Sequence, residues 1–293
     1  MPPTEPSSIE DVREGLQGAG YLAGESAALV AYLATRLGKP VLVEGPAGVG
    51  KTELAKALSR YLDRPLVRLQ CYEGLDEAKA LYEWNYRKQL LRIQAEAQDT
   101  GWSEVQDDIF GEEFLLTRPL LQAISSEEPV VLLIDEIDKT DQEFEAMLLE
   151  ILSDFQVSIP EMGVVEARTR PVVLLTSNNT RELTEALKRR CLYLWLDYPD
   201  VEHELEIVRL HAPELDATVA RKLVEVIGMV RDLDLKKPPS IAESIDWARA
   251  LLLLGATDID DAVFRDTMSV IVKHRTDLDL VAERVGVKLV TRA

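Results

Sequence analysis

Short apolar runs alternate with helical patterns over the first two thirds of the chain. Five runs are typical of strands, at residues 41–43, 66–69, 130–134, 172–175 and 192–196. Three of them (41–43, 130–134 and 172–175) are continuously apolar, as expected of parallel strands that are covered by helices on both faces. Segments with helical spacing separate the runs, beginning with residues 25–37. The pattern predicts a three-layer α/β domain with a five-stranded parallel sheet.

After Tyr198 and Pro199 the pattern changes to helices alone. The expected helices cover residues 202–210, 217–231, 242–254, 260–273 and 278–285. Pro238 and Pro239 separate two of them, because paired prolines cannot continue a helix. We therefore expect an α/β core at residues 1–198, with a long insertion at about 72–128, and a smaller all-helical lid domain at residues 199–293.

A glycine-rich segment directly follows the first predicted strand and precedes an amphipathic helix. Residues 45–52 read GPAGVGKT. Such glycines let the backbone aim N–H groups at phosphate oxygens, where a helix N-terminus adds favourable partial charge. Lys51 is expected to reach the β- and γ-phosphates, and the Thr52 hydroxyl to ligate Mg²⁺. The context argues against a chance turn and predicts that ATP is bound by Gly45, Pro46, Ala47, Gly48, Val49, Gly50, Lys51, Thr52 and Glu53.

A second motif, VVLLIDEID, places two carboxylates at the end of an apolar strand. Asp135 and Glu136 are expected at the carboxyl edge of the sheet, where ligands of open α/β sheets bind. Asp135 is placed to hold Mg²⁺ through water, and Glu136 to accept a proton from the attacking water. The glycine-rich loop argues against the alternative, a solvated acidic turn. Thr140 and Glu143 further predict a capping box at the start of the next helix.

The segments GPAGVGKTELAKAL and VLLIDEID resemble the P-loop and acidic strand of the MoxR branch of the AAA+ ATPases, and the resemblance covers nearly the whole chain. It implies that Asn178, in LLTSNN, positions the attacking water. It also implies an arginine finger in ALKRRC that acts in the neighbouring subunit's site, so catalysis requires a homo-oligomer, expected to be a hexameric ring. Arg190 is preferred over Arg189, because it aligns with the finger when Cys191 replaces the family's aromatic residue.

The lid helix in PPSIAESIDWA departs from the family pattern. The family usually carries a second phosphate-sensing arginine there, whereas the matching position in this chain is Ala242. Arg249 lies on the same predicted helix, two turns later.

Two hairpins are expected outside the main sheet. In the insertion, Tyr82, Trp84 and Tyr86 recur at every second position and would share one face of an extended hairpin. An aromatic edge that contacts a substrate or partner and ordinary packing both remain open. The second hairpin covers residues 155–171, with its turn at 161–163, and the resemblance implies that it lies near the ring pore.

Four longer segments resemble the CoxD group of the MoxR branch, the accessory ATPases of aerobic carbon monoxide dehydrogenase maturation. They are RLQCYEGLDEAKALYEWNYRKQLL, FLLTRPLLQAI, EILSDFQVSIPE and ALKRRCLYLWLDYPD. This implies an ATP-hydrolysing chaperone that remodels a molybdenum-containing hydroxylase, with a partner that bears a von Willebrand factor A domain. The alternative is a MoxR-type ATPase that remodels another metalloenzyme.

Composition narrows the function classes. A formal net charge of -19 argues against a nucleic-acid motor or clamp loader, because nucleic-acid binding needs clustered Lys and Arg. The lid and the finger candidates argue against a monomeric P-loop kinase or switch. No leader and no apolar run of roughly 20 residues is visible, so we expect a cytoplasmic protein without an intrinsic membrane segment. Cys71 and Cys191 lack metal-site spacing and are expected to be buried thiols.

Overall fold

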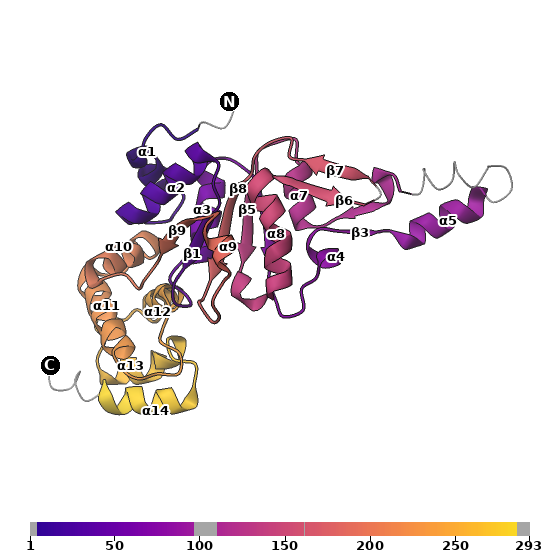
Figure 1. Cartoon of the computed structure of the whole chain (residues 1–293). Coiled ribbons are helices and arrows are strands. Elements are labelled where there is room, and N and C mark those ends of the chain that lie inside the picture. Colours follow the sequence, from indigo (N-terminus) through magenta and orange to yellow (C-terminus); the bar gives the residue numbers. More distant parts are fainter. Residues whose placement is uncertain (1–4, 97–109, 161, 286–293) are drawn as a thin grey trace. The chain divides into compact units, whose positions relative to one another are not determined.

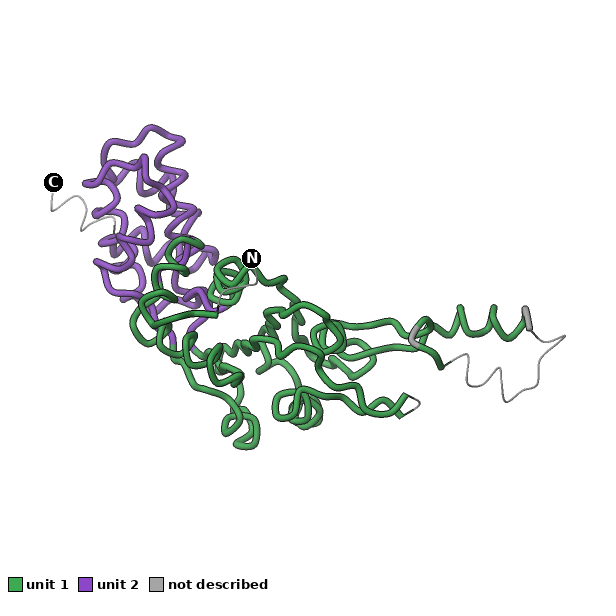
Figure 2. The backbone as a smooth tube through the Cα atoms, turned by 90° about the horizontal axis from the view of Figure 1, so that it is seen from above, with its two compact units in different colours: residues 1–19, 23–44, 52–195 green, residues 20–22, 45–51, 196–293 purple. Residues whose placement is uncertain are grey.

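The computed structural model describes residues 5–96, 110–160 and 162–285 of the chain (Figure 1). Contacts between residues divide the chain into two compact units, coloured separately in Figure 2. Unit 1 comprises residues 1–19, 23–44 and 52–195, and unit 2 comprises residues 20–22, 45–51 and 196–293. The glycine-rich loop therefore clusters with the helical residues that follow 195, although in the sequence it joins a strand and a helix of the α/β unit.

Unit 1 is built on a five-stranded sheet with the strand order β2-β5-β8-β1-β9. All neighbouring pairs are parallel. Strands β1, β5 and β8 are buried along their whole length. The prediction of a five-stranded parallel sheet is therefore confirmed. The strands are β1 (Val41–Glu44), β2 (Leu66–Gln70), β5 (Val131–Asp135), β8 (Val172–Ser177) and β9 (Leu192–Trp195).

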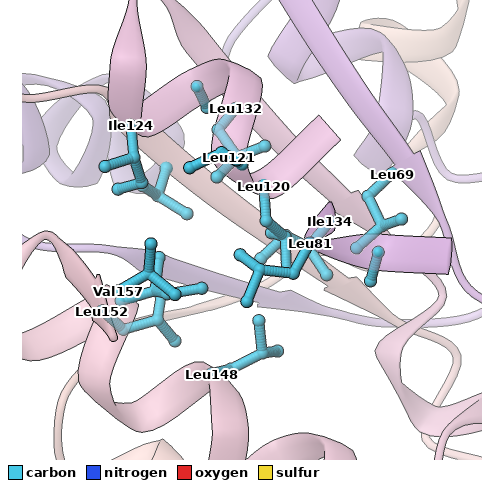
Figure 3. Close-up of a cluster of buried hydrophobic side chains, with 14 of the residues drawn as sticks. Leu69, Leu81, Leu120, Leu121, Ile124, Leu132, Ile134, Leu148, Leu152 and Val157 are labelled. Carbon is cyan, nitrogen blue, oxygen red and sulfur yellow. The ribbon is translucent and has the colours of Figure 1, made fainter. Parts of the chain in front are cut away.

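Helices cover this sheet, and their apolar side chains form the hydrophobic core of unit 1 together with those of the strands. Side chains of α7, α8 and β5 belong to one hydrophobic cluster, in which Figure 3 labels Leu121, Leu148 and Leu132. Helix α2 packs on β1, β8 and β9. The helices of unit 1 outside the insertion are α1 (Ile9–Gly18), α2 (Glu25–Leu37), α3 (Lys51–Tyr61, of which Lys51 clusters with unit 2), α7 (Pro119–Ser125), η2 (Ile137–Lys139), α8 (Gln142–Asp154) and α9 (Glu185–Lys188).

In the insertion, the structure favours ordinary packing over an aromatic contact edge, the two interpretations that the sequence left open. Strand β3 (Tyr82–Trp84) pairs with β4 (Leu115–Thr117) in antiparallel fashion, but it ends at Trp84. The Asn85 side chain then accepts the Lys88 N–H at 3.1 Å at the start of α5. Trp84 is buried in the core, whereas Tyr86 lies in the helix and is 63% exposed. The remaining elements of the insertion are α4 (Glu77–Ala80), α5 (Tyr86–Glu96) and η1 (Glu112–Phe114).

The second predicted hairpin is present. Strand β6 (Gln156–Ile159) pairs with β7 (Gly163–Glu166) in antiparallel fashion. The N–H of Met162 donates to the carbonyl oxygen of Ile159 at 3.1 Å in the turn. Of the three predicted turn residues, Glu161 lies outside the described residues.

The capping box predicted at Thr140 is wrong by one residue. Helix α8 has Asp141 as its N-cap, and the Asp141 carboxylate accepts the Phe144 N–H at 2.8 Å. The Thr140 hydroxyl donates instead to the carbonyl oxygen of Ile137 at 2.8 Å. Two adjacent residues of capping type compete here, and the carboxylate forms the cap.

Unit 2 is helical after residue 195. Its core contains Trp247 and Phe264, and the indole N–H of Trp247 donates to the Thr267 hydroxyl at 2.8 Å. Helix α12 begins with a capping box of Ser240 and Glu243. The helix expected at 260–273 ends earlier and continues as a short 3₁₀ turn. The elements are α10 (Val201–His211), α11 (Ala217–Arg231), α12 (Ile241–Leu254), α13 (Asp261–Thr267), η3 (Met268–Val270) and α14 (Arg275–Arg284).

Within the described ranges, none of the helices has the length and apolar character needed to cross a bilayer.

Helix α12 offers a matched test of core packing, since Leu251 is 0% exposed and Leu253 is 88% exposed. We expect Leu251→Ala to lower the free energy of unfolding by about 2–5 kcal/mol, because it removes buried methyl groups and leaves a cavity. Leu253→Ala should change it by no more than about 0.5 kcal/mol. Urea titration followed by tryptophan fluorescence measures both, and equal losses would contradict the packing described for α12.

Candidate nucleotide site

The glycine-rich loop, residues 45–51, is shaped by close approach to other residues of unit 2. Gly48 has φ +81°, and a Cβ at this position would lie 2.1 Å from the Cβ of Ser240. A Cβ on Gly45 would lie 1.9 Å from the carbonyl oxygen of Leu196. The carbonyl oxygen of Gly48 also accepts the Ile241 N–H at 3.1 Å. Glycine is required at both positions because backbone and side chains from beyond residue 195 lie against the loop.

An aromatic residue also fixes the loop. The Tyr198 hydroxyl donates to the carbonyl oxygen of Ala47 at 3.0 Å. The Arg231 guanidinium lies 4.5 Å from the centre of the Tyr198 ring. Arg231 is itself held by Glu204, which is buried and accepts two hydrogen bonds from it at 2.5 and 2.8 Å. The sequence motif alone gave no sign of this support.

Lys51 is the one charged residue predicted within the loop, and it is only 6% exposed. Its Nζ donates to the carbonyl oxygens of Gly45 and Pro46, each at 2.7 Å. A buried ammonium needs such acceptors, because it has three donors and no solvent. The lysine is therefore folded back over its own loop.

In unit 1, Asp135 lies at the end of β5 and is 2% exposed. Its Oδ1 accepts the Thr52 hydroxyl at 3.0 Å and the Thr176 hydroxyl at 2.5 Å. Its Oδ2 accepts Arg68 Nη2 at 2.6 Å and Nε at 3.1 Å. Both oxygens are thus satisfied, which a buried carboxylate requires. Thr52 and Asp135 were expected from the sequence, whereas Arg68 and Thr176 were not, because their only signal is a polar residue within an otherwise apolar strand.

Glu136 follows with φ +59°, in the left-handed region that residues other than glycine seldom adopt. Its N–H donates to the Thr176 hydroxyl at 2.9 Å. Its carboxylate Oε2 accepts Gln70 Nε2 at 2.8 Å and Lys139 Nζ at 2.6 Å. The hydrogen bond and the charge of Glu136 raise the pKa of Lys139. The turn after β5 therefore directs the two acidic side chains to separate sets of donors.

Asn178 directly follows β8, and a third acidic residue holds its loop. Asp138 is 4% exposed, and its Oδ2 accepts the N–H and the hydroxyl of Thr180 at 3.1 and 2.6 Å. Burial alone raises the pKa of Asp138, but hydrogen bonds from Thr180 and the Asn178 backbone outweigh it and lower the pKa. Asp138 was missed in the sequence, although it is the last residue of the DEID motif.

The two finger candidates lie at the end of α9. Both are exposed, and Arg189 is the C-cap residue of that helix. Arg190 Nη1 donates to the carbonyl oxygen of Ala186 at 3.0 Å, and its Nε donates to the hydroxyl of Ser153 on α8. Over the residues that the structure describes, neither arginine bonds to Asp135 or Glu136. Unit 1 thus brings Thr52, Asp135 and Glu136 together and leaves the arginines outside that cluster.

The lid positions noted in the sequence are both at the surface. Ala242 is exposed in the first turn of α12. Arg249 is exposed as well, with its Nη1 3.9 Å from an oxygen of Asp246.

The two cysteines are not exposed thiols. Cys71 is 1% exposed, and its N–H donates to the carbonyl oxygen of Asp135 at 2.8 Å. Cys191 is only partly buried, so the expectation of a buried thiol is confirmed for Cys71 alone. Burial raises the pKa of each thiol to about 12.

The Thr52 and Asp135 oxygens fit Mg²⁺. They are hard oxygen donors placed 3.0 Å apart, and Mg²⁺ is usually held by one or two side chains together with substrate phosphates. Among the described residues, no group of three or more His, Cys, Asp and Glu side chains is arranged to hold a metal ion.

Comparison with known proteins gives one family and several relatives. A model of the ATPase family associated with various cellular activities (AAA) matches residues 41–194. The gas vesicle ATPase GvpN2 of Halobacterium salinarum is 26% identical over 267 residues, covering 87% of this chain and 75% of that protein. GvpN of Haloferax mediterranei is 26% identical over 205 residues, and the match covers 67% of this chain and 57% of that protein. The chain thus spans little more than half the length of this second relative. An uncharacterized protein of Staphylococcus aureus is 29% identical over 224 residues, covering 74% of this chain and 76% of that protein.

Among solved structures, a single-residue variant of RuvB from Thermotoga maritima is similar with a TM-score of 0.53. The match covers 91% of this chain and 73% of that one, at 18% sequence identity. At this identity the similarity shows a shared fold.

The glycine contacts give a matched pair of substitutions. Gly48 and Gly74 both have positive φ, +81° and +77°, but only Gly48 has a neighbour that an added Cβ would meet. We expect Gly48→Ala to displace the loop and to weaken binding of a fluorescent ATP analogue about tenfold or more. A tenfold change corresponds to about 1.4 kcal/mol of binding free energy. Gly74→Ala carries the same backbone strain and should bind normally. Equal affinities for the two variants would show that the Ser240 contact does not shape the loop.

Proposed function

Because the chain belongs to the AAA family, the ATPases associated with various cellular activities, we propose that it hydrolyses ATP to ADP and phosphate with Mg²⁺. The observation that carries this proposal is the Thr52–Asp135 hydrogen bond of 3.0 Å, with Glu136 beside it on the same turn. In P-loop ATPases, a hydroxyl and a carboxylate at such a distance are the protein groups that hold the Mg²⁺ of the bound nucleotide.

Each residue then has a separate task. Residues 45–53 bind the phosphates, and Lys51 exchanges its two carbonyl partners for phosphate oxygens. Thr52 and Asp135 hold Mg²⁺, which when bound neutralises phosphate charge. Glu136 accepts a proton from the attacking water, and Asn178 orients that water. Because Gln70 and Lys139 hold Glu136 Oε2, its other oxygen is the one available to the water.

We also propose that hydrolysis needs a neighbouring copy of the chain. Arg190, or Arg189 as the alternative, acts as the finger that stabilises charge in the neighbour's site. The support is their exposed position at the end of α9, apart from the Asp135 cluster of their own chain. The assembly is a homo-oligomeric ring of six subunits, in which residues 1–198 form the ATPase core and 199–293 the lid.

We expect Arg190→Ala to lower kcat by on the order of 10³-fold, while ATP affinity stays near normal, because the finger acts only on transition-state charge. The specific activity of the unmodified protein should rise with protein concentration as subunits assemble. Steady-state hydrolysis across a dilution series measures both. Normal turnover by Arg190→Ala would move the assignment to Arg189, and normal turnover by Arg189→Ala as well would exclude a finger in this segment.

The work done with ATP is, in this proposal, the remodelling of a protein client in the cytoplasm. The finer assignment follows the CoxD-like segments, above all RLQCYEGLDEAKALYEWNYRKQLL. The client is then a molybdenum-containing carbon monoxide dehydrogenase or a related hydroxylase, and a von Willebrand factor A domain protein assists. A second candidate is suggested by similarity over 87% of the chain to a gas vesicle ATPase. Here the client is a gas vesicle component.

A trapped variant separates these candidates. Glu136→Gln should keep ATP bound without turnover, and so retain the client during purification from the native host in Mg-ATP. Lys51→Ala is the matched control, because it loses phosphate binding and should release the client. Recovery of a molybdenum hydroxylase or its accessory protein supports the finer proposal. Recovery of gas vesicle proteins favours the second candidate, and equal recovery with Lys51→Ala would reject ATP-dependent client binding.

A further inference from the structure

Two buried carboxylates hold the connection between β8 and α9. Residues 178–184 contain no helix or strand, so backbone ladders do not fix them. Asp138 and Glu145 are 4% and 0% exposed, and each accepts two hydrogen bonds from a single threonine of this connection. A carboxylate that receives both the N–H and the hydroxyl of one residue fixes its position and its orientation together.

The first of these contacts lies next to the acidic turn. Asp138 Oδ2 accepts the Thr180 N–H at 3.1 Å and the Thr180 hydroxyl at 2.6 Å. The backbone of Asn178 also donates to Asp138. Asp138 belongs to η2, which has Glu136 as its N-cap residue. The contact therefore ties the loop of Asn178 to the turn that carries Glu136.

The second contact lies at the start of α9. Glu145 Oε2 accepts the Thr184 N–H at 2.9 Å and the Thr184 hydroxyl at 2.6 Å. Arg181 Nη1 lies 2.6 Å from the other oxygen of Glu145, so the buried charge is paired. Thr184 is the N-cap residue of α9. This contact fixes the end of α9 at which the helix begins.

The other end of α9 is tied to the same helix. Arg190 donates to Ser153, and both Ser153 and Glu145 belong to α8. The two residues are separated by about 12 Å along α8 at 1.5 Å per residue. Helix α9 is thus attached at both ends to α8, and the direction in which Arg190 leaves it follows from these attachments.

We propose that Asp138 and Glu145 are positioning residues with separate targets: Asp138, through Thr180, places Asn178 for the chain's own site, and Glu145, through Thr184, places the arginines of α9 for the neighbouring subunit's site. This inference rests on the proposed ring-forming ATPase. In this proposal, the contacts of residues 178–184 position groups for two catalytic sites, one in the same chain and one in the neighbouring subunit.

The threonine hydroxyls give a test that leaves both carboxylates in place. In homo-oligomers, Thr180→Val and Thr184→Val should each lower kcat on the order of tenfold to a hundredfold, because small misplacements of reacting groups cost this much. The KM for ATP should stay unchanged. Thr180→Ser and Thr184→Ser retain the hydroxyl and should retain activity. Thr169→Val is the matched control, because it removes a hydroxyl that donates at 3.3 Å to the carbonyl oxygen of Ser126. This variant should leave both kcat and the KM for ATP unchanged.

Mixed rings separate the two targets. Thr180→Val mixed with Arg190→Ala should regain turnover, because the second chain offers an intact site and the first an intact finger. Thr184→Val mixed with Arg190→Ala should not, because both chains lack a placed finger. If Arg189→Ala rather than Arg190→Ala is the inactive variant, Arg189→Ala is used in both mixtures. Where a threonine-to-valine variant does not fold, the corresponding threonine-to-alanine variant takes its place.

Recovery in both mixtures, or in neither, would overturn the separate roles. If the unmodified protein hydrolyses ATP at a specific activity independent of its concentration, the proposed ring fails instead. Concentration-dependent turnover with the wrong mixing pattern would refute the positioning roles alone.

Discussion

A carboxylate that is buried at the end of a parallel strand must be surrounded by donors, and the rest of the site depends on how this chain supplies them to Asp135. The donors come from three different elements: Thr52 of α3, Thr176 of β8 and Arg68 of β2. They meet only when β2, β5 and β8 lie side by side in that order with their carboxyl ends together. The strand order and the chemistry at Asp135 are therefore one requirement, since loss of any donor leaves a buried charge partly unpaired.

The same logic extends along the chain from Asp135. Asp138 and Glu145 are also buried carboxylates, and each is satisfied by a threonine from the segment after β8. Satisfying them places Asn178 at one end of that segment and α9 at the other. In unit 2 a comparable network of Glu204, Arg231 and Tyr198 holds the glycine-rich loop. In both units, hydrogen bonds to buried carboxylates fix the positions of segments that have no helix or strand of their own.

Features that follow from local pattern could be predicted from the sequence. The strands were found within one or two residues, because continuous apolar runs are unambiguous in an α/β chain, and the GPAGVGKT and DEID motifs are contiguous. Partners distant in sequence could not be found: Arg68 and Asp135 are 67 positions apart, and Ser240 meets Gly48 only through the fold. The alternation of Tyr82, Trp84 and Tyr86 could not decide between a shared face and ordinary packing, because helix α5 begins at Tyr86, directly after Asn85. Local spacing does not record where a strand gives way to a helix.

We propose that this member of the AAA family completes its catalytic site with a neighbouring copy of the chain. The most direct test is the mass of Glu136→Gln in solution, measured by light scattering with and without Mg-ATP. We expect a nucleotide-dependent assembly of about six subunits, the closed ring that a head-to-tail interface generates. A monomer that persists at saturating Mg-ATP would contradict the claim, because Arg190 and Arg189 would then have no neighbouring site to enter.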